Sequence, residues 1–511
     1  MKVLFVYPDY DVVLEPKTGR VLRVEPGGWY SEGLACLSAI LKADGHQVSL
    51  YHLVRPASRE EFMARVKAEA PALIGFSTAT RAFSASCQLA EWIKAELDVP
   101  IVVGSYHAIY VPEQTSSIPY FDAVCTGEGE HPLRELAARV AQGLPYHDIP
   151  GLWVRTADGV VRNGPGRYVE DLDEVPIPDY GLFDFGKLLS SQIRTAIVIL
   201  SRGCPYACTY CWNNSLKNSG RKPPVRFMSP KRCIERIERL REVYPDVRYL
   251  SFRDDVLPWK EGWLEEFAQL YIERINLPFS CNFRANFVTH TIMKILRRMG
   301  CYQVFFGVES GNDYIRNDVL KRRMSREEII TAFAACRAEG IGTVSYNMIG
   351  LPFEDMPKVL DTIKLNAEIK ADIPLNPRYH PFPGTELFDL SVQSGFLPVD
   401  FDYQEELFLE QPGLTNADLS FLLRYFKRFV GLYRWAYSLR PSLRGRAERM
   451  LDRIFLSRWL PRRFLTWLAD RSDRGMERAK SVMRRRSPRV YLWLRDRVRR
   501  VPVSKTPAAA A

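Results

Sequence analysis

The chain has 511 residues, 46% of them hydrophobic and 26% charged, which is the composition of a globular protein large enough for two or three domains. The formal net charge is +11, but residues 431–500 hold 20 Arg and 1 Lys against 6 acidic residues, so the basic character belongs to the C-terminal region. No apolar run reaches the roughly 18 residues of a membrane span, the apolar start is too short for a signal peptide, and scattered cysteines suit a reducing compartment, so we expect a cytoplasmic protein.

Residues 1–145 alternate short apolar runs with helical patterns. Strands are expected at 2–7, 48–53, 72–77, 100–103 and 123–125, and helices at 31–43 and 83–97. Strands separated by helices of this length predict an α/β fold with a parallel, doubly wound sheet. Such sheets bind ligands at the carboxyl ends of the strands, near the point where the strand order reverses.

Small and polar residues follow three of these strands, at Ser77–Thr80, Gly104–His107 and Thr126–Glu130. Small side chains let a backbone approach a ligand closely, but they also occur in ordinary tight turns. The residues alone leave both interpretations open.

Residues 146–190 break the pattern and predict a linker with a small hairpin around Asp158-Gly159, followed by a proline-stiffened connector at 171–179. From 191 to 390, six strand candidates alternate with helical patterns. Strands are expected at 196–200, 247–252, 279–283, 303–307, 343–348 and 377–380, and helices at 230–243, 263–275, 289–299, 326–339 and 356–369. This alternation predicts a partial (β/α)6 barrel, an open version of the TIM barrel.

Three cysteines, Cys204, Cys208 and Cys211, directly follow the first of these strand candidates with the spacing C-x3-C-x2-C. Three thiolates on one loop can hold three irons of a cubane cluster and leave the fourth iron open. A structural zinc site would need a fourth protein ligand, usually from a second pair, and a disulfide would leave one cysteine over. The spacing therefore predicts an iron–sulfur site. Four other cysteines fall in strand or helix patterns and are expected in the core: Cys233, Cys281, Cys301 and Cys336.

The cysteine spacing, with Tyr210 before the third cysteine, resembles the signature of the radical S-adenosylmethionine (SAM) superfamily. Residues 102–107 and 126–130 resemble the "GG-x-H" and "GEGE" loops of the cobalamin-binding domain that precedes many radical SAM domains. The sequence departs from that pattern at Ser105, where a second glycine is usual. Residues 171–179 resemble the linker between the two domains. The resemblance covers about residues 1–390 and implies a cobalamin-dependent radical SAM enzyme.

This resemblance implies a Rossmann-like cobalamin-binding domain at 1–145, the linker at 146–190, a radical SAM barrel at 191–390 and a helical, basic region at 391–511. It implies a [4Fe-4S] cluster bound by the three cysteines, together with SAM and cobalamin. The implied SAM residues are Tyr210, Asp255, Arg284, Glu309 and Ser310. The implied cobalamin residues are Ser77, Thr78, Gly104, Ser105, His107, Gly127 and Glu128.

Two of these assignments carry alternatives. Asp254 and Asp255 follow the second expected barrel strand, where carboxylates suit a bound amine or hydroxyl, or else the cap of the following helix. The residues around His46 match part of a motif whose histidine is the lower axial ligand of cobalt. However, His46 lies at a helix-to-strand turn, where that motif does not occur. We expect His46 to be a turn residue, which leaves the lower face of cobalt unassigned, and no catalytic residue is predicted.

The C-terminal region spaces aromatic residues between arginines at 419–439, 446–470 and 488–500. Helical spacing of this kind suits a helix at an anionic membrane surface. The alternative is a helical cap packed on the barrel with a solvated basic face. A nucleic-acid partner is less favoured, because no RNA-binding module is present.

The resemblance implies that the cluster reduces SAM to a 5′-deoxyadenosyl radical, with an electron from a donor such as flavodoxin or ferredoxin. The favoured reaction is methylation of an unactivated carbon in a small molecule, either a lipid or a secondary metabolite. Ring formation or oxidation, as in anaerobic tetrapyrrole cyclisation, remains the alternative. A tRNA methylthiotransferase is less favoured, because the N-terminal cysteines Cys36, Cys87 and Cys125 are too widely spaced for a second cluster.

Overall fold

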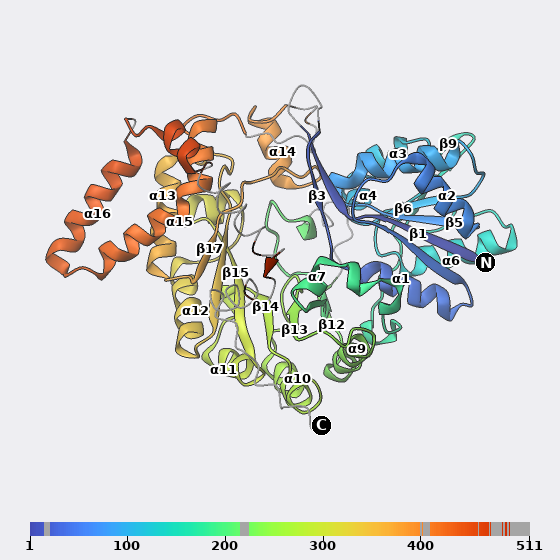
Figure 1. Cartoon of the computed structure of the whole chain (residues 1–511), viewed down its shortest axis with the longest axis horizontal. Coiled ribbons are helices and arrows are strands. Elements are labelled where there is room, and N and C mark those ends of the chain that lie inside the picture. The colour runs from blue at the N-terminus through green and yellow to red at the C-terminus, as the bar shows by residue number, and fades with distance from the viewer. Residues whose placement is uncertain are drawn as a thin grey trace. The chain divides into compact units, whose positions relative to one another are not determined.

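The computed structural model describes residues 1–14, 21–214, 224–398, 401, 409–457, 459–469, 471, 483, 486–487 and 490 (Figure 1). The chain forms two compact units, which are described separately. The first comprises Met1–Pro258, Pro381–Val392 and Pro398–Leu407, and the second comprises Trp259–His380, Gln393–Leu397 and Phe408–Ala511. This division falls after the second expected barrel strand and not at residue 190.

Five parallel strands of the first unit form a sheet in the order β4-β1-β5-β6-β7. They are β1 (Lys2–Pro8), β4 (Gln47–Leu53), β5 (Leu73–Ser77), β6 (Ile101–Gly104) and β7 (Ala123–Cys125), all close to the expected positions. Because β1 lies between β4 and β5, the strand order reverses there. The carboxyl ends of β1 and β5 are therefore the expected place for a ligand.

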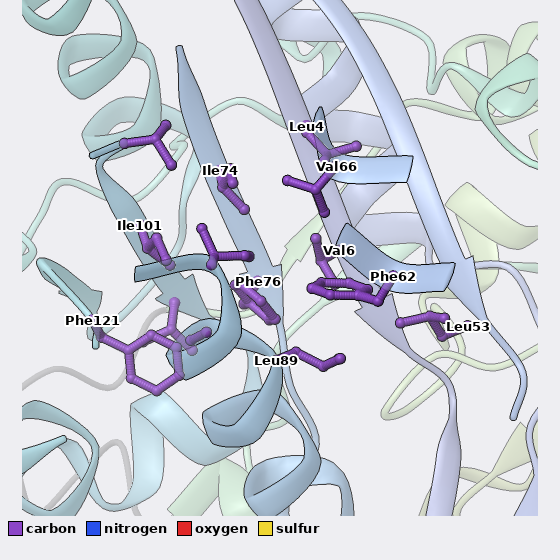
Figure 2. Close-up of a cluster of buried hydrophobic side chains, with 14 of the residues drawn as sticks. Leu4, Val6, Leu53, Phe62, Val66, Ile74, Phe76, Leu89, Ile101 and Phe121 are labelled. Atoms are coloured by element: carbon purple, nitrogen blue, oxygen red, sulfur yellow. The ribbon is translucent and has the colours of Figure 1, made fainter. Parts of the chain in front are cut away.

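Helices connect these strands: α1 (Glu32–Ala43), α2 (Arg59–Glu69), α3 (Phe83–Lys94), α4 (Tyr106–Tyr110), α5 (Pro112–Ser117), α6 (Glu130–Gln142) and the 3-10 turn η1 (Thr80–Ala82). Figure 2 shows how the core forms between them and the sheet: Val6 and Phe76 from the strands meet Phe62 of α2 and Leu89 of α3. These side chains are almost completely buried, and burial of this kind supplies most of the stability of such a layer.

A β-hairpin extends this sheet beyond its parallel part. β8 (Leu152–Thr156) and β9 (Gly159–Arg162) pair around the expected Asp158-Gly159 turn, and β8 also pairs antiparallel with β7. Residues 152–162, expected in the linker, therefore belong to the first sheet. The backbone groups along the edge of β7 need partners, and the hairpin supplies them. A second hairpin, which the sequence did not predict, consists of β2 (Tyr10–Leu14) and β3 (Val21–Pro26).

The connector that follows is a series of short turns: η2 (Leu172–Glu174), η3 (Tyr180–Leu182), η4 (Phe185–Lys187) and α7 (Leu189–Gln192). It is anchored to α1, because Asp179 accepts hydrogen bonds from Ser38 at 2.7 Å and from Lys42 at 2.6 Å. Two barrel strands then follow in the first unit, β10 (Thr195–Val198) and β13 (Tyr249–Phe252), which pair in parallel. Between them lie β11 (Ser201–Arg202), β12 (Arg226–Phe227) and α9 (Pro230–Val243).

The second unit contains four parallel strands that pair in chain order. They are β14 (Phe279–Phe283), β15 (Cys301–Glu309), β16 (Gly342–Asn347) and β17 (Ile373–Leu375). The helices of this part are α10 (Glu261–Arg274), α11 (His290–Arg298), α12 (Arg326–Ala338) and α13 (Met356–Glu368), with the turn η5 (Ala285–Phe287) and the π-helix η6 (Tyr314–Val319). With β10 and β13 in the first unit, the chain has the six strand–helix repeats expected of a partial barrel.

The last of these strands does not lie where the sequence predicted. The expected strand 377–380 is wrong: β17 ends at Leu375, and beyond it Arg378 makes only an isolated bridge with Ile349. Pro377 has no N–H to donate to a strand ladder, and Pro374 is accommodated because β17 is the edge strand.

The C-terminal region is helical, as expected, with α14 (Glu386–Gln393), α15 (Asn416–Ser438) and α16 (Pro441–Leu456). In the second unit, Phe421, Phe426 and Val430 of α15 share a buried cluster with Val359 and Ile363 of α13. α15 is therefore part of the folded core and is more than a surface appendage. None of the helices described is both long and apolar enough to cross a bilayer. Most of the expected aromatic-basic segment 488–500 lies outside the described residues.

Candidate functional site

The cysteine loop, residues 203–214, follows β11 in the first unit. Gly203 opens it with a φ of +90°, a conformation that glycine adopts without strain. The N–H of Cys211 donates to the carbonyl of Cys208 at 3.1 Å, which closes a tight turn. Burial raises the pKa of the Cys211 thiol to about 12, and Cys208 and Cys204 are among the neighbours that raise it further. The three thiols, none of them in a disulfide, therefore lie within electrostatic range of one another.

Asp254 anchors the strand end that precedes this loop. Its Oδ1 accepts hydrogen bonds from the N–H of Leu200 at 2.8 Å and from the hydroxyl of Ser201 at 2.6 Å. The carboxyl is completely buried, and burial raises its pKa to about 7 despite these hydrogen bonds. The helix-cap interpretation is wrong, because α10 begins at Glu261 with Lys260 at its N-cap.

Asp255 holds the cysteine loop itself. Its carboxylate accepts hydrogen bonds from the side chain of Asn213 and from the backbone N–H of Gly203, so it joins the beginning and the end of the loop. Burial raises the pKa of Asp255, while these two hydrogen bonds act in the opposite direction. The Asp255 side chain also lines a cavity, so it contacts the cysteine loop and borders the cavity at the same time.

That cavity, of about 370 Å³, lies within the first unit. Its wall includes residues at the ends of β5, β6 and β7 and residues of the cysteine loop. The expected cobalamin residues that line it are Ser77, Gly104, Ser105, Gly127 and Glu128, and the cysteine-loop residues are Gly203, Trp212 and Asn213. Both expected cofactor regions of the first unit therefore face one space.

Two expected cobalamin residues do not line this cavity. His107 is completely buried, its ring stacks on Phe83 with centroids 3.8 Å apart, and burial lowers its pKa to about 3, so the imidazole is neutral. Thr78 is also buried, and it accepts a hydrogen bond from Ser86 at 2.9 Å. These two side chains shape the loops from inside the domain.

Ser105 has a backbone conformation that glycine prefers. Its φ is +78° and its ψ is −168°, a region that residues with a Cβ rarely enter. This is the position at which the resemblance expects glycine. Strain of this kind persists where the surrounding structure imposes it, and here it lies on the wall of the cavity.

Aromatic side chains from two distant segments also meet at this cavity. Trp212, which directly follows the third cysteine, lies edge-on to Tyr106 of α4 with ring centroids 5.1 Å apart. Tyr110 lies 6.1 Å from the same tryptophan. Sequence reasoning did not single out these three residues, although an aromatic directly after the cysteine triple was a usable signal.

Three of the expected SAM residues, Arg284, Glu309 and Ser310, lie in the second unit. Glu309 ends β15 with a φ of +66°, and its Oε1 lies 3.7 Å from Nη1 of Arg322. Arg284 donates to the carbonyl of Arg322 and, at 2.8 Å, to Asn286. Buried Arg322 therefore links Arg284 to Glu309, although the sequence did not mark it.

Ser310 is completely buried and lies beside Thr362 of α13, with the two hydroxyl oxygens 3.4 Å apart. The next residue, Gly311, packs so closely on this helix that a Cβ would come 2.3 Å from the carbonyl oxygen of Asp361. The loop after β15 is thus fixed against α13. Tyr210, the last expected SAM residue, lies half-buried in the cysteine loop of the first unit.

The amino-acid sequence matches two known families. Residues 198–365 match the Radical SAM superfamily, and residues 21–137 match the B12 binding domain. The chain belongs to the cobalamin-dependent radical SAM enzymes. Its cofactors are a [4Fe-4S] cluster, SAM and cobalamin.

Relatives of this cobalamin-dependent radical SAM enzyme include an uncharacterized methyltransferase of Pyrococcus horikoshii, 27% identical over 87% of this chain and 94% of that protein. The anaerobic magnesium-protoporphyrin IX monomethyl ester cyclase of Rubrivivax gelatinosus is 24% identical over 76% of this chain and 69% of its own. The hopanoid C-3 methylase of Methylococcus capsulatus is 25% identical over 76% and 72%. The solved structure of the radical SAM methyltransferase TsrM from Kitasatospora setae has the same fold, with a TM-score of 0.61 at 15% identity, over 88% of this chain and 99% of that one.

The cysteine loop of this enzyme fits a cubane cluster. A cubane takes one thiolate on each of three irons, so the sulfurs need to share one loop without converging on one point. Among the described residues, no three His, Cys, Asp or Glu side chains gather around a single metal position. The loop has the ligand types of a cluster site, three cysteine thiols that are not joined in disulfides.

The cavity fits part of a cobalamin molecule. A Cβ built on Gly127 would meet no atom within 4 Å, and one on Gly104 would only touch Cys125 at 3.5 Å. These glycines leave the space between the loops open, which a close approach of ligand to backbone requires. Buried Cys36 and Cys125 also line the cavity, and sequence reasoning missed both. The four cysteines expected in the core are all buried, as predicted.

The buried carboxyl of Asp254 makes stability depend on pH. Its pKa of about 7 lies above the ordinary value of 3.8, so the folded state favours the protonated form. Its stabilising contribution is complete below the ordinary pKa and is lost as pH rises through about 7. The D254N variant keeps the acceptor oxygen but cannot ionise. We therefore expect the free energy of unfolding of D254N to rise relative to that of the wild type as pH increases. The expected change is ~1.4 kcal/mol for each unit by which the pKa of Asp254 differs between the folded and unfolded states. Urea unfolding at about pH 5 and about pH 8 measures this, and a wild-type-minus-variant difference that does not change with pH would contradict it.

Relief of the strain at Ser105 should stabilise the protein. We expect S105G to raise the free energy of unfolding by about 1 kcal/mol, because the gain from removing the strained Cβ exceeds the added entropy of the unfolded chain. Thermal unfolding of the cofactor-free chain measures this. The control is S58G, at a serine with a φ of −70°, where the same change should cost a few tenths of a kcal/mol. A loss of stability in S105G would show that Ser105 is not strained.

Proposed function

We propose that this enzyme methylates an unactivated carbon of a small, lipid-like molecule. The observation that carries the proposal is the shared cavity of the first unit, whose wall is built from both the cysteine loop and the loops after β5, β6 and β7. A methyl donor bound by those loops and a radical source on the cysteine loop could then act on one substrate. The methyltransferases among the relatives support this reaction.

When bound, the cluster and SAM supply a radical that removes a hydrogen atom from carbon, and cobalamin supplies the methyl group that replaces it. The chain's own side chains bind and orient. Asp255 holds the cysteine loop through Gly203 and Asn213. Tyr106 and Trp212 form an aromatic part of the cavity wall, which keeps water from a reactive radical. The enzyme also requires a one-electron donor of the flavodoxin or ferredoxin type.

The test is anaerobic reconstitution with iron, sulfide and hydroxocobalamin, which carries no methyl group, followed by a low-potential reductant, SAM carrying a deuterated methyl group and a lipid extract. Methylation predicts a product that gains the labelled methyl group. The control is the same mixture with a C208A variant, which cannot assemble the site. A product formed without the label would refute methylation.

Ring formation is the second candidate, because cyclases of magnesium-protoporphyrin IX monomethyl ester are among the relatives. The same experiment separates the two reactions. Cyclisation predicts a product that has lost hydrogen and carries no label from SAM. A porphyrin ester in place of the lipid extract tests the cyclase substrate directly.

We also propose that the enzyme works at the inner face of a membrane. Large apolar side chains are exposed along α15, α16 and the residues that follow: Leu432, Trp435, Leu443, Met450, Ile454, Leu456, Trp459, Phe464, Trp467 and Leu468. Trp459 is 94% exposed. Exposed apolar residues gathered in one region mark an interaction surface, whereas single ones are ordinary.

The geometry of α16 specifies the kind of surface. Leu443, Met450 and Ile454 are 7 and 4 residues apart, so they share one helical face. An adjacent face carries exposed arginines at 446, 449 and 453, while Leu451 and Phe455 are buried on the side that joins the α13–α15 core. An apolar strip beside a row of arginines suits the interface of an anionic bilayer.

We expect a double variant, L443E and I454E, to lose binding to vesicles that contain anionic lipid by about tenfold or more, because two apolar side chains no longer enter the interface. Sedimentation with vesicles of phosphatidylglycerol and phosphatidylcholine measures this, and phosphatidylcholine alone should bind weakly. The matched control is L144E with V161E, at exposed apolar positions in the first unit. Equal binding by both double variants would refute a membrane role for α16.

A further inference from the structure

The cysteine loop is closed at its base by a short two-stranded stem. β11 and β12 pair antiparallel, with Ser201 opposite Phe227 and Arg202 opposite Arg226. All three cysteines lie between the two strands in the sequence, so the stem determines where the loop starts and returns. Two arginines directly across from each other repel, which would open the stem if nothing compensated their charges.

Glu128 and Glu130, from the loop after β7, supply that compensation. Glu128 receives both terminal nitrogens of Arg226, with Oε2 to Nη1 at 3.2 Å, and lies 3.5 Å from Arg202. Arg202 forms its shorter ion pair, at 2.6 Å, with Glu130. The two positive and two negative charges balance, and the bidentate geometry at Arg226 also fixes orientation.

This cluster is only partly open to water: the side chains of Arg202 and Glu128 are 26% and 17% exposed. The side chains of Arg226 and Glu130 are 7% and 9% exposed. Burial by itself would raise the pKa of Glu128, but Arg226 and Arg202 outweigh it and hold that pKa below its ordinary value, so Glu128 is ionised. Oε2 of Glu128 also accepts a hydrogen bond from the backbone N–H of Val169 at 3.0 Å. The carboxylate therefore joins the stem to the linker as well.

We infer that Glu128 is a positioning residue that clamps the stem of the cysteine loop onto the cavity loop after β7, so that cluster assembly and cobalamin binding are coupled. The same short loop, Thr126–Glu130, contributes cavity wall through Gly127 and grips the stem through its two glutamates. A cofactor that orders this loop from the cavity side also orders the stem. By linkage, a cluster that orders the stem favours cobalamin to the same extent.

This role differs from the one that the resemblance implies, in which Glu128 binds cobalamin directly. Its carboxylate already receives the forked guanidinium of Arg226, the charge of Arg202 and the N–H of Val169. The three hydrogen bonds among those contacts take most of the roughly four acceptor positions of a carboxylate, which leaves little for a direct ligand. The two roles make opposite predictions for the partner arginine, because only the clamp makes Arg226 as important as Glu128.

The test measures iron content and cobalamin affinity in the full-length chain and does not require turnover, so its outcome is independent of the methylation proposal. The affinity for hydroxocobalamin is titrated by absorbance before and after anaerobic loading with iron and sulfide. For the wild type we expect loading to tighten binding by about 5-fold or more, within the usual range of such coupling. For E128Q we expect that ratio to fall toward one and the iron bound per chain to fall by about half or more.

R226K is the decisive companion variant, because it keeps the charge but loses the forked contact. The clamp predicts that R226K lowers iron content and coupling as E128Q does. If E128Q weakens cobalamin equally in both forms at full iron content, and R226K changes nothing, Glu128 is a direct ligand and the clamp is refuted. E135Q, at an exposed position of α6, removes the same charge away from the stem and should match the wild type. If E128Q fails to fold by circular dichroism, R226K alone decides between the two roles.

Discussion

Replacement of Cys208 by alanine is expected to abolish product formation, with a loss well beyond the roughly 100-fold that removal of a supporting residue around a metal site costs. Cys208 is the middle residue of the triple and the most buried of the three, at 5% exposure. Two thiolates cannot hold the three irons that a cubane with one open position requires. The measurement is iron and sulfide per chain after anaerobic reconstitution, followed by the yield of 5′-deoxyadenosine from SAM.

The matched control for this prediction is C233A. Cys233 is also a buried cysteine of the first unit, but it lies in α9, and it loses the same sulfur atom on replacement. We expect C233A to retain its iron, with only the modest loss of stability that a small core cavity causes. Full iron content in C208A would overturn the assignment of the cluster site.

Replacement of Gly127 by leucine is expected to weaken cobalamin binding by about 5- to 150-fold, the range that about 1–3 kcal/mol of overpacking represents. A Cβ at this position meets nothing within 4 Å, and the backbone there does not have a positive φ, so the protein itself should tolerate a side chain. The leucine would instead project into the cavity that Gly127 lines. Titration of hydroxocobalamin by absorbance measures the change in affinity.

G164L is the control for this second prediction. Gly164 is an exposed glycine of the first unit, a Cβ there also meets nothing within 4 Å, and it does not line the cavity. Both variants should unfold at the temperature of the wild type, whereas only G127L should lose cobalamin. Unchanged affinity in G127L would show that cobalamin binds elsewhere.

The elements around the site could be predicted closely from local patterns. Apolar runs of strand length located β1, β5 and β7, because a buried parallel strand must be apolar along its whole length. The helix expected at 230–243 is α9, which begins at Pro230 with Ser229 as its N-cap. The last barrel strand was misplaced at 377–380, where Pro377 lacks the N–H that a strand would need, and β17 ends at Leu375.

The interactions that hold the site together could not be predicted in this way. Arg226 is 98 residues from Glu128, and Tyr106 is more than a hundred residues from Trp212 in the sequence. A charged residue has the same local pattern whether it is solvated or paired. Asp254 is an example. Its position after a strand was compatible with a helix cap or with a residue that binds a ligand. In the structure its carboxylate instead accepts hydrogen bonds from Leu200 and Ser201.

The sequence by itself determined the family, through the spacing of Cys204, Cys208 and Cys211 and the small residues that follow three parallel strands. These are short-range patterns, and short-range chemistry is what a sequence records directly. Only the tertiary structure decided which side chains share the cavity, that His107 turns away from it, and that Glu128 meets two arginines. Those outcomes depend on how strands distant in the chain are brought into register, because a sheet places residues side by side according to pairing and not according to sequence distance.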